Sequence, residues 1–350
     1  MSGASGTFAE RLIAWQRRAG RHDLPWQGQR DPYAIWIAEV MLQQTQVTTV
    51  IPYYRRFLEH FPCVAALAAA ELDQVLELWS GLGYYARARH LHRAAREIME
   101  TWGGTFPTRS EDLAQLPGMG RSTAAAVAVF AFGERAAILD GNVKRVLARH
   151  LGIEGYPGAP AVERRLWQEA QALLPRRDIE AYTQGLMDLG ATVCTRTQPR
   201  CAACPVAEDC VARCTGRVDR LPMPRPRRPL PQREVQWLVV LRAEEVLLEK
   251  RASLGLWGGL WSFPEAGVDE DPALWCARVL EAQPQALAAL EPLTHAFTHF
   301  ALRIHPRLVR VERVAQQAAQ PGRLWLPVPE AAQAAVPAPV RRVLRSIPAI

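Results

Sequence analysis

The sequence predicts a mainly α-helical N-terminal region followed by a smaller α+β domain. Three observations lead to this prediction. Apolar residues recur at helical spacing through most of residues 8–192, a group of cysteines follows at 194–210, and short strand-like runs begin at residue 233. A chain of 350 residues is long enough for two domains, each with its own core.

The helical pattern of the first region is interrupted by turn signals rich in glycine. Helical spacing is clearest in FAERLIAWQRR, DPYAIWIAEVMLQQTQV, RARHLHRAAREIME, STAAAVAVFAFG and NVKRVLARHLG. Turn signals separate these runs, among them Gly81-Leu82-Gly83, Gly103-Gly104, Pro117-Gly118 and Gly141-Asn142. We therefore expect this region to consist mostly of helices separated by turns.

The composition is typical of a globular protein without membrane spans. Hydrophobic residues make up 49% of the chain and charged residues 22%, and no apolar run approaches the length of a membrane span. The first residues, MSGASGTFAERLIAWQRR, lack the apolar stretch of a signal peptide, so we expect a cytosolic protein. The net charge of +7 is compatible with a nucleic-acid partner without being specific for one.

Four of the seven cysteines fall in one short segment. Cys194, Cys201, Cys204 and Cys210 are separated by six, two and five residues, so a single loop can wrap four thiolates around one metal centre. Tetrahedral zinc accepts four cysteines, and a 4Fe–4S cluster is held in the same way. Zinc sites usually contain two CxxC pairs and this segment has one, which favours iron–sulfur and leaves zinc open. Disulfides are not expected in the cytosol.

The stretch LPGMGRSTAAAV, residues 116–127, predicts a tight turn that opens a helix. Gly118 and Gly120 let a phosphate approach the backbone, and the helix start presents unpaired N–H groups at its positive end. The alternative is an ordinary helix–helix turn capped by Ser122 or Thr123. With a metal loop and an excess of positive charge in the same chain, the sequence favours a DNA-binding hairpin.

Two carboxylates stand out against their surroundings. Glu39 lies in WIAEVMLQQTQV among apolar residues, so desolvation should raise its pKa and keep it protonated; the alternative is a buried ion pair with an arginine. Asp140 opens the helix NVKRVLAR, where it should stay ionised; the alternative is a simple N-cap. An acid and a carboxylate with separated pKa values are the groups that cleave a glycosidic bond through an oxocarbenium-like transition state.

The motifs together match a known family. AEVMLQQTQV, GLGYYARARHL, LPGMGRSTA, ILDGNVKRVLAR, the four cysteines and FTHF resemble the helix–hairpin–helix DNA glycosylases, and most closely the adenine DNA glycosylases of the MutY type. The resemblance implies two helical lobes plus an iron–sulfur loop at 194–210, within a catalytic region at 1–216. It further implies a Pro/Arg-rich linker at 217–232 and a Nudix-like, lesion-recognition domain at 233–350.

The resemblance also implies a reaction and a role for several residues. The substrate would be duplex DNA in which adenine is mispaired with 8-oxoguanine or guanine, the adenine being flipped out of the stack. Glu39 matches the acid that protonates adenine and then helps to activate water, and Asp140 matches the carboxylate that stabilises the cationic sugar. Gln43 and Gln44 match residues beside the lesion pair, and Tyr84 an aromatic beside 8-oxoguanine. The cluster would be structural and the protein a monomer.

Ser122 separates two activities within this fold. The related endonuclease III family has a lysine there, which forms a Schiff base with the sugar and cuts the strand. Serine cannot form an imine, so the sequence predicts a monofunctional glycosylase that leaves an abasic site. Lys144 is expected to contact phosphate, and the alternative is that it traps the sugar incidentally.

In the C-terminal domain, LWGGLWSFPE resembles the start of a Nudix fold, but the RExxEE metal-binding box of Nudix hydrolases does not follow. Pyrophosphatase activity is therefore not expected. Phe297, Thr298 and His299 match a loop that contacts 8-oxoguanine in the family; the alternative is a strand with alternating core aromatics. The motifs leave two alternative functions for the whole chain: an oxidised-pyrimidine glycosylase/lyase, and a DNA-binding or electron-transfer protein built around the cluster.

Overall fold

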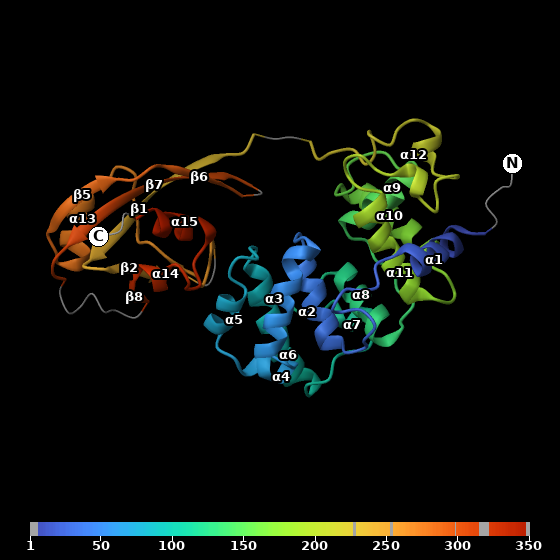
Figure 1. The fold of residues 1–350 in the computed structure, drawn as a ribbon, viewed down its shortest axis with the longest axis horizontal. Helices are drawn as coiled ribbons and strands as arrows, with labels where there is room; N and C mark the ends of the chain where they lie inside the picture. Colours follow the sequence, from blue (N-terminus) through green and yellow to red (C-terminus); the bar gives the residue numbers. More distant parts are fainter. Residues whose placement is uncertain (1–5, 227–228, 253–254, 298, 315–321, 348–350) are drawn as a thin grey trace. The chain divides into compact units, whose positions relative to one another are not determined.

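The computed structural model describes residues 6–226, 229–252, 255–297, 299–314 and 322–347 (Figure 1). Contacts divide the chain into two compact units, one formed by Met1–Ala69 with His90–Arg227 and the other by Ala70–Arg89 with Arg228–Ile350. This grouping places Ala70–Arg89, which the sequence analysis assigned to the helical region, with the C-terminal strands. The predicted domain boundaries at 216/217 and 232/233 stay predictions.

The first unit consists of helices joined by short loops. Its helices are α1 (Phe8–Ala19), α2 (Pro32–Leu42), α3 (Val47–His60), α4 (Val64–Ala69), most of α6 (Ala86–Trp102), α7 (Ser110–Leu113), α8 (Arg121–Phe132), α9 (Gly141–His150), α10 (Pro160–Ala172), α11 (Ile179–Asp188) and α12 (Val211–Cys214). A π-helical turn (Leu189–Val193) extends α11, and a 3-10 turn (Cys201–Ala203) lies in the cysteine loop. Within the described residues, no helix combines the length and the apolar content that crossing a membrane requires.

A hydrophobic core joins α1 to α8, α9, α10 and α11. Its fully buried members include Leu12 of α1, Leu147 of α9 and Leu166 of α10. Burial of each such leucine contributes about 1.5–3 kcal/mol. The core therefore fixes α9, which begins next to Asp140, against α1 and α11.

Helix α2 is apolar on all sides. Trp36, Ile37 and Met41 are almost completely buried, and a helix that is hydrophobic all round is stable only inside a protein. Asp31 caps its start by accepting a hydrogen bond from the Tyr33 backbone N–H at 3.0 Å. Glu39 is thereby carried into an apolar environment by the helix to which it belongs.

The turn before α8 requires glycine at one position. Gly118 has φ +75°, and a Cβ there would lie 2.5 Å from the Cβ of His90. A side chain would therefore be strained by the backbone and would collide with α6. Gly120 has no such constraint, because a Cβ there would meet open space.

The second unit is built on a mixed β-sheet. Its strands are β1 (Gln232–Arg242), β2 (Glu245–Lys250), β3 (Trp261–Ser262), β4 (Glu265–Ala266), β5 (Pro284–Ala289), β6 (Leu293–Ala296), β7 (Ala301–Val311) and β8 (Arg323–Pro327). Its helices are α5 (Leu72–Leu78), α13 (Pro272–Leu280), α14 (Val328–Ala331) and α15 (Ala338–Ser346), and it also contains the start of α6. The main strand order is β3-β2-β1-β7-β5, and β1 pairs with β7 in parallel while the other pairs are antiparallel.

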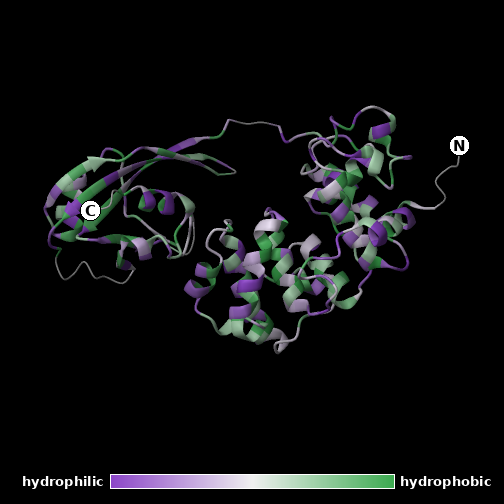
Figure 2. Cartoon of the chain, in the orientation of Figure 1, coloured by the Kyte–Doolittle hydropathy of each residue, from purple (hydrophilic) through white to green (hydrophobic). Residues whose placement is uncertain are grey.

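Helices cover both faces of this sheet. Trp237 and Val239 of β1 point into a core shared with α14 and α15, and Leu238 and Val240 into a core shared with α13. Figure 2 shows the alternation of hydrophilic and hydrophobic residues along the strands and helices. A helical first region followed by an α+β second region, as the sequence predicted, is confirmed.

Candidate active site and cysteine centre

A cavity of about 420 Å³ opens in the helical unit, and Glu39 forms part of its wall. This size is in the range of ligand-binding pockets. Its polar lining residues are Gln16, Arg21, His22, Gln27, Gln29, Arg30, Glu39, Glu180 and Gln184. Its apolar lining residues include Leu24, Trp26, Ile35, Leu42, Val47, Phe130 and Met187. The cavity thus combines flat apolar surface with several hydrogen-bonding groups.

The carboxyl group of Glu39 is held in an environment that favours its protonated form. Burial raises the pKa of Glu39 to about 8, and the negative charge of Asp140 adds to the rise. Among the described residues, no lysine or arginine offsets this shift by pairing with Glu39. The predicted rise in pKa is confirmed, and the alternative of a buried ion pair with an arginine is not what the chain forms.

Asp140 caps the start of α9. Its Oδ1 accepts a hydrogen bond from the Val143 backbone N–H at 2.7 Å. Burial nevertheless raises the pKa of Asp140, opposed by the N–H groups of Val143 and Asn142 and by the charges of Arg145 and Lys144. The helix start favours the ionised form of Asp140, as the sequence predicted, but desolvation has the larger effect on its pKa. Asp140 and Glu39 are near enough for one charge to act on the other.

The first turn of α8 links the segments that carry the two carboxyl groups. The Leu139 backbone N–H donates to Ser122 Oγ at 2.9 Å, and Gln43 Nε2 donates to Thr123 Oγ1 at 3.1 Å. The N-cap of α8 is Gly120, without a side-chain cap. Ser122 and Thr123 therefore do not act as the caps considered from the sequence, and the backbone at Gly120 borders open space.

Two further predicted site residues lie in this unit. Gln44 follows α2 in an exposed position with φ +58°, in the left-handed region that residues other than glycine seldom occupy. Lys144 forms an ion pair with Glu163 at 2.6 Å. Its ammonium group is therefore already engaged by a carboxylate in the protein without DNA.

The other predicted contacts belong to the sheet-containing unit. Tyr84 is 53% exposed and has φ +49°. Phe297 stacks on Phe300 with ring centroids 4.7 Å apart, and the Phe297 backbone N–H donates to the Phe300 carbonyl. His299 is exposed, whereas Thr298 lies outside the described residues. Strand β6 ends at Ala296, and Phe297 and Phe300 pack against the core of this unit, as the alternative of core aromatics expected.

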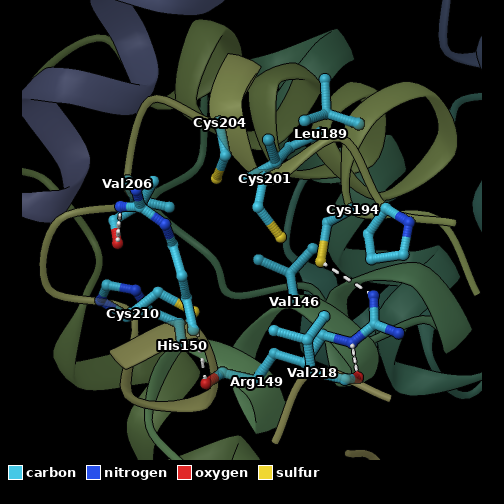
Figure 3. A pocket seen from close by; sticks show the side chains of 14 residues that line it. Val146, Arg149, His150, Leu189, Cys194, Cys201, Cys204, Val206, Cys210 and Val218 are labelled. Carbon is cyan, nitrogen blue, oxygen red and sulfur yellow. Dashed lines mark hydrogen bonds between the residues drawn. The ribbon is translucent and has the colours of Figure 1, made fainter. Parts of the chain in front are cut away.

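The four cysteines of the loop line a single cavity, together with apolar residues and Arg149 (Figure 3). Burial raises the pKa of Cys204 to about 11 and also raises that of Cys210, and neighbouring cysteines contribute to both shifts. Within the described ranges, no three His, Cys, Asp or Glu side chains lie close enough to hold a single metal ion. The four cysteines therefore surround one common space, as the spacing in the sequence predicted.

Arginine side chains fix the cysteine loop to α9. Arg149 donates to Cys194 Sγ at 3.4 Å and to the Thr195 carbonyl at 2.6 Å. Arg145 donates to the Cys194 carbonyl at 2.7 Å and to Asn142 Oδ1 at 2.8 Å. The helix that begins at Asp140 is therefore bonded directly to the loop.

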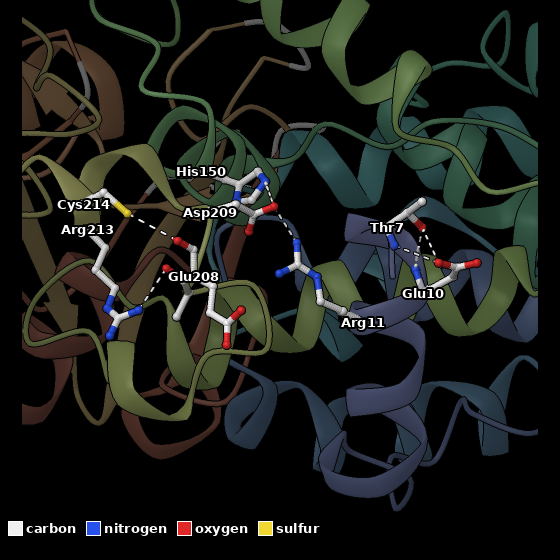
Figure 4. Close-up of polar contacts among 9 residues, drawn as sticks. Thr7, Glu10, Arg11, His150, Glu208, Asp209, Arg213 and Cys214 are labelled. Carbon is white, nitrogen blue, oxygen red and sulfur yellow. Dashed lines mark hydrogen bonds and ion pairs between the residues drawn. The ribbon is translucent and has the colours of Figure 1, made fainter. Parts of the chain in front are cut away.

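A second attachment ties the same loop to α1. Arg11 forms an ion pair with Asp209 at 2.5 Å, and His150 Nε2 lies 4.0 Å from the same carboxylate (Figure 4). Asp209 directly precedes Cys210. Cys214 is exposed, and its thiol donates to the Glu208 carbonyl at 3.4 Å, outside the cavity that the other four cysteines line.

Most residues of the cavity wall were not predicted from the sequence. Trp26 and Gln27 come from the loop before α2, and Gln184 comes from α11. The available signal was the stretch DLPWQGQRDP, a Pro/Gly-rich loop that holds a tryptophan and two amides, because loops on a rigid scaffold often carry binding groups.

Comparison with known proteins agrees with this architecture. The family described as HhH-GPD superfamily base excision DNA repair protein matches residues 37–172, and the family described as NUDIX domain matches residues 236–346. The predicted fold class, a helix–hairpin–helix glycosylase region followed by a Nudix-like domain, is confirmed.

Similar proteins extend over nearly the whole chain. The adenine DNA glycosylase of Buchnera aphidicola subsp. Acyrthosiphon pisum (strain APS) is 33% identical over 97% of each chain. The adenine DNA glycosylase of Homo sapiens is 35% identical over 97% of this chain and 73% of its own length. A solved thermostable thymine-DNA glycosylase superposes with a TM-score of 0.55 at 30% identity, covering 59% of this chain and 95% of that one. The chain therefore belongs to the adenine DNA glycosylase family, whose members hydrolyse N-glycosyl bonds.

Proposed function

We propose that the protein removes adenine mispaired with 8-oxoguanine or guanine in duplex DNA and leaves an abasic site. The observation that carries this proposal is the position of Glu39 on a cavity wall, where burial and the nearby charge of Asp140 raise its pKa. An acid and a carboxylate in these environments are what hydrolysis of a glycosidic bond requires.

In the proposed reaction the adenine is flipped into the cavity, where Trp26 offers a flat apolar surface and Gln27 and Gln184 offer amides. Glu39 donates its proton to an imidazole-side ring nitrogen of the base. The bond from C1′ to N9 breaks, and its electron pair leaves with the base. The Asp140 carboxylate stabilises the cationic sugar. Water then bonds to C1′ and gives a proton to Glu39, which restores the acid.

The same groups favour simple hydrolysis over strand cleavage. Ser122 cannot form an imine, and its hydroxyl already accepts from Leu139. Lys144 is the cation nearest in sequence to Asp140, and its pairing with Glu163 opposes attack on the sugar. We therefore propose a monofunctional enzyme.

We propose that Cys194, Cys201, Cys204 and Cys210 hold a 4Fe–4S cluster. Four thiols around one cavity, with only one CxxC pair among them, support a cluster held by four thiolates. The cluster would cross-link the loop that Arg145, Arg149 and Asp209 attach to α9 and α1. In this proposal its role is structural.

DNA contacts are proposed on both units. Gly118, Gly120, Gln43, Gln44 and Lys144 would contact the duplex from the helical unit, and Tyr84, Phe297, Thr298 and His299 from the other. The Nudix-like domain would bind the opposite base without hydrolysing a pyrophosphate, because α13, PALWCARVL, carries no carboxylate that could bind a metal. We propose that the protein acts as a monomer in the cytoplasm.

The test is Glu39→Gln in the full-length, cluster-loaded protein. The variant should lose turnover on a duplex with adenine opposite 8-oxoguanine, while its affinity for that duplex stays within about twofold of the unchanged protein. Glu100→Gln serves as the control, since Glu100 is an exposed residue of α6 paired with Arg96. A variant at Glu39 that still releases adenine at the original rate would refute the proposal.

A further inference from the structure

The loop between α5 and α6 holds an aromatic side chain in a strained position. Gly81 has φ +105°, Gly83 has φ +72° and Tyr84 has φ +49°. Glycine tolerates this region, but tyrosine does so only when its surroundings enforce it. The Tyr84 side chain is also 53% exposed. Something other than burial must therefore hold this residue in place.

Arg87 supplies the contacts that hold the loop backbone. The residue is only 8% exposed, and its guanidinium donates to the carbonyls of Leu82 at 3.3 Å and Gly83 at 3.1 Å. Its own backbone N–H donates to the Tyr84 carbonyl at 2.9 Å. Arg87 thus donates to three consecutive backbone carbonyls, those of Leu82, Gly83 and Tyr84.

The same guanidinium lies close to two aromatic rings. Its Cζ is 5.3 Å from the ring centroid of Trp79 and 5.6 Å from that of Tyr84. Trp79 is fully buried and donates its indole N–H to the Gly83 carbonyl at 3.2 Å. The Arg87 guanidinium therefore lies near both the exposed Tyr84 ring and the buried Trp79 ring. Both contacts are cation–π interactions, which are attractive.

Burial lowers the pKa of Arg87 to about 10, which leaves the side chain charged at neutral pH. A planar, charged guanidinium can bond two carbonyls and lie near two rings at once, whereas a lysine ammonium is a single point of charge on a flexible chain. An Arg87→Lys variant thus keeps the charge and loses the geometry.

We propose that Arg87 is a positioning residue that holds the Tyr84 ring ready to stack on a base of the duplex. This inference rests on the proposed function, because it takes the ligand to be DNA with a lesion opposite adenine. It deepens that function by assigning the presentation of Tyr84 to Arg87. A ring fixed before binding avoids the entropic cost of being ordered on the duplex. Aromatic stacking on one base accepts any base, so the gain is affinity rather than base-edge recognition.

The first experiment needs no DNA. Hydrogen–deuterium exchange is measured on the full-length, cluster-loaded protein with Arg87→Lys, with Arg93→Lys as the matched control, since Arg93 is exposed on the same helix. We expect faster exchange in residues 81–87 for Arg87→Lys, and unchanged exchange for the control. Equal exchange in the two variants would overturn the proposal, whatever the protein binds.

The second experiment is a double-substitution cycle. Binding to duplexes with adenine opposite 8-oxoguanine is measured in a Glu39→Gln background, which prevents turnover. Arg87→Lys should weaken binding about threefold to tenfold in the presence of Tyr84 and by less than about twofold beside Tyr84→Ala. A purely structural role would give equal losses in both backgrounds, and that result would contradict the proposal. Equal melting temperatures for Arg87→Lys and Arg93→Lys show that folding is not the cause.

The two proposals fail in different ways. If the unchanged protein binds lesion and ordinary duplexes equally and releases no adenine, the proposed function is wrong. The exchange experiment then still decides whether Arg87 holds the loop. If adenine release is normal and the cycle shows additive losses, the role of Arg87 is wrong and the function stands.

Discussion

Ser122 Oγ accepts a hydrogen bond from the backbone N–H of Leu139, the residue that precedes Asp140, at 2.9 Å. The neighbouring hydroxyl of Thr123 accepts from Gln43, one helical turn beyond Glu39. Two adjacent side chains at the start of α8 therefore hold both segments that carry the proposed catalytic carboxyl groups. The position that holds a lysine nucleophile in the endonuclease III family would here orient Asp140.

Replacing Ser122 by alanine should slow base release without preventing it. The Leu139 N–H would lose its partner, and a hydrogen bond of this kind contributes about 1 kcal/mol, so the single-turnover rate should fall about threefold to tenfold. Thr123→Ser keeps the hydroxyl that Gln43 uses and should stay near the original rate. An unchanged rate for Ser122→Ala would show that this bond does not position Asp140.

The pH profile of base release should have two limbs. The reaction needs Glu39 protonated, and burial raises its pKa to about 8, so the rate should fall as pH rises through about 8. It also needs Asp140 ionised, and because burial raises the pKa of Asp140, the acid limb should lie above the ordinary aspartate value of 3.8. Single-turnover rates across pH measure both limbs. A rate that keeps rising above pH 8 would contradict the role of Glu39.

The same shift predicts a change in stability. The folded protein keeps a proton on Glu39 that the unfolded chain releases at its ordinary pKa of 4.5, so stability is lost as pH rises from about 4.5 towards 8. Glu39→Gln removes this loss. The difference in melting temperature in favour of the variant should therefore grow across that interval and then level off. A difference that is constant with pH would count against the raised pKa.

The aspartates at the two ends of α11, Asp178 and Asp188, allow an exposed ion pair to be compared with a buried one. Asp188 is fully buried and accepts from the Arg21 backbone at 2.9 Å, from its guanidinium at 2.7 Å and from Gln184 at 2.9 Å. Asp178 pairs with Arg17 on the surface. Asp188→Asn should reduce the free energy of unfolding by about 2 kcal/mol, and Asp178→Asn by no more than about 1 kcal/mol.

Arg21 and Gln184 both line the cavity, so Asp188→Asn should also weaken the binding of the flipped base. Urea unfolding and the substrate dependence of the single-turnover rate check the two effects. Equal stability of the two variants would show that the buried contacts do not anchor the cavity wall.

The cysteines allow a similar comparison. Cys204→Ser removes one of the four side chains around the shared cavity and should abolish the visible absorbance of a cluster and most of its iron, about four atoms per chain. Cys214→Ser alters an exposed thiol outside that cavity and should retain both. Iron content and the absorbance spectrum are the measurements. Zinc at one atom per chain in the unchanged protein would refute the cluster.

Local sequence was sufficient where a feature depends on its neighbours in the chain. Part of the apolar surroundings of Glu39 comes from its own helix, the positive φ of Gly118 from its turn, and the four thiols from one short loop. For these features, enough of the environment comes from residues that are close in sequence. They could therefore be predicted without knowledge of the packing.

Features that depend on packing could not be predicted in this way. The raised pKa of Asp140 comes from burial by elements distant in sequence, and Gln27 and Gln184 meet at the cavity only because α11 packs on α1. The parallel pairing of β1 with β7 joins residues about seventy positions apart, such as Val235 with Ile304. The stacking of Phe297 on Phe300 likewise depends on packing against the core of the sheet unit.

The measurement that tests the account most directly is single-turnover treatment of a labelled duplex with one adenine opposite 8-oxoguanine, read with and without hot alkali. The account predicts strand breaks only after alkali, and none in either lane for Glu39→Gln. Strand breaks without alkali would show lyase activity, with Lys144 as the candidate nucleophile. An intact strand in both lanes, from cluster-loaded protein, would contradict the removal of adenine.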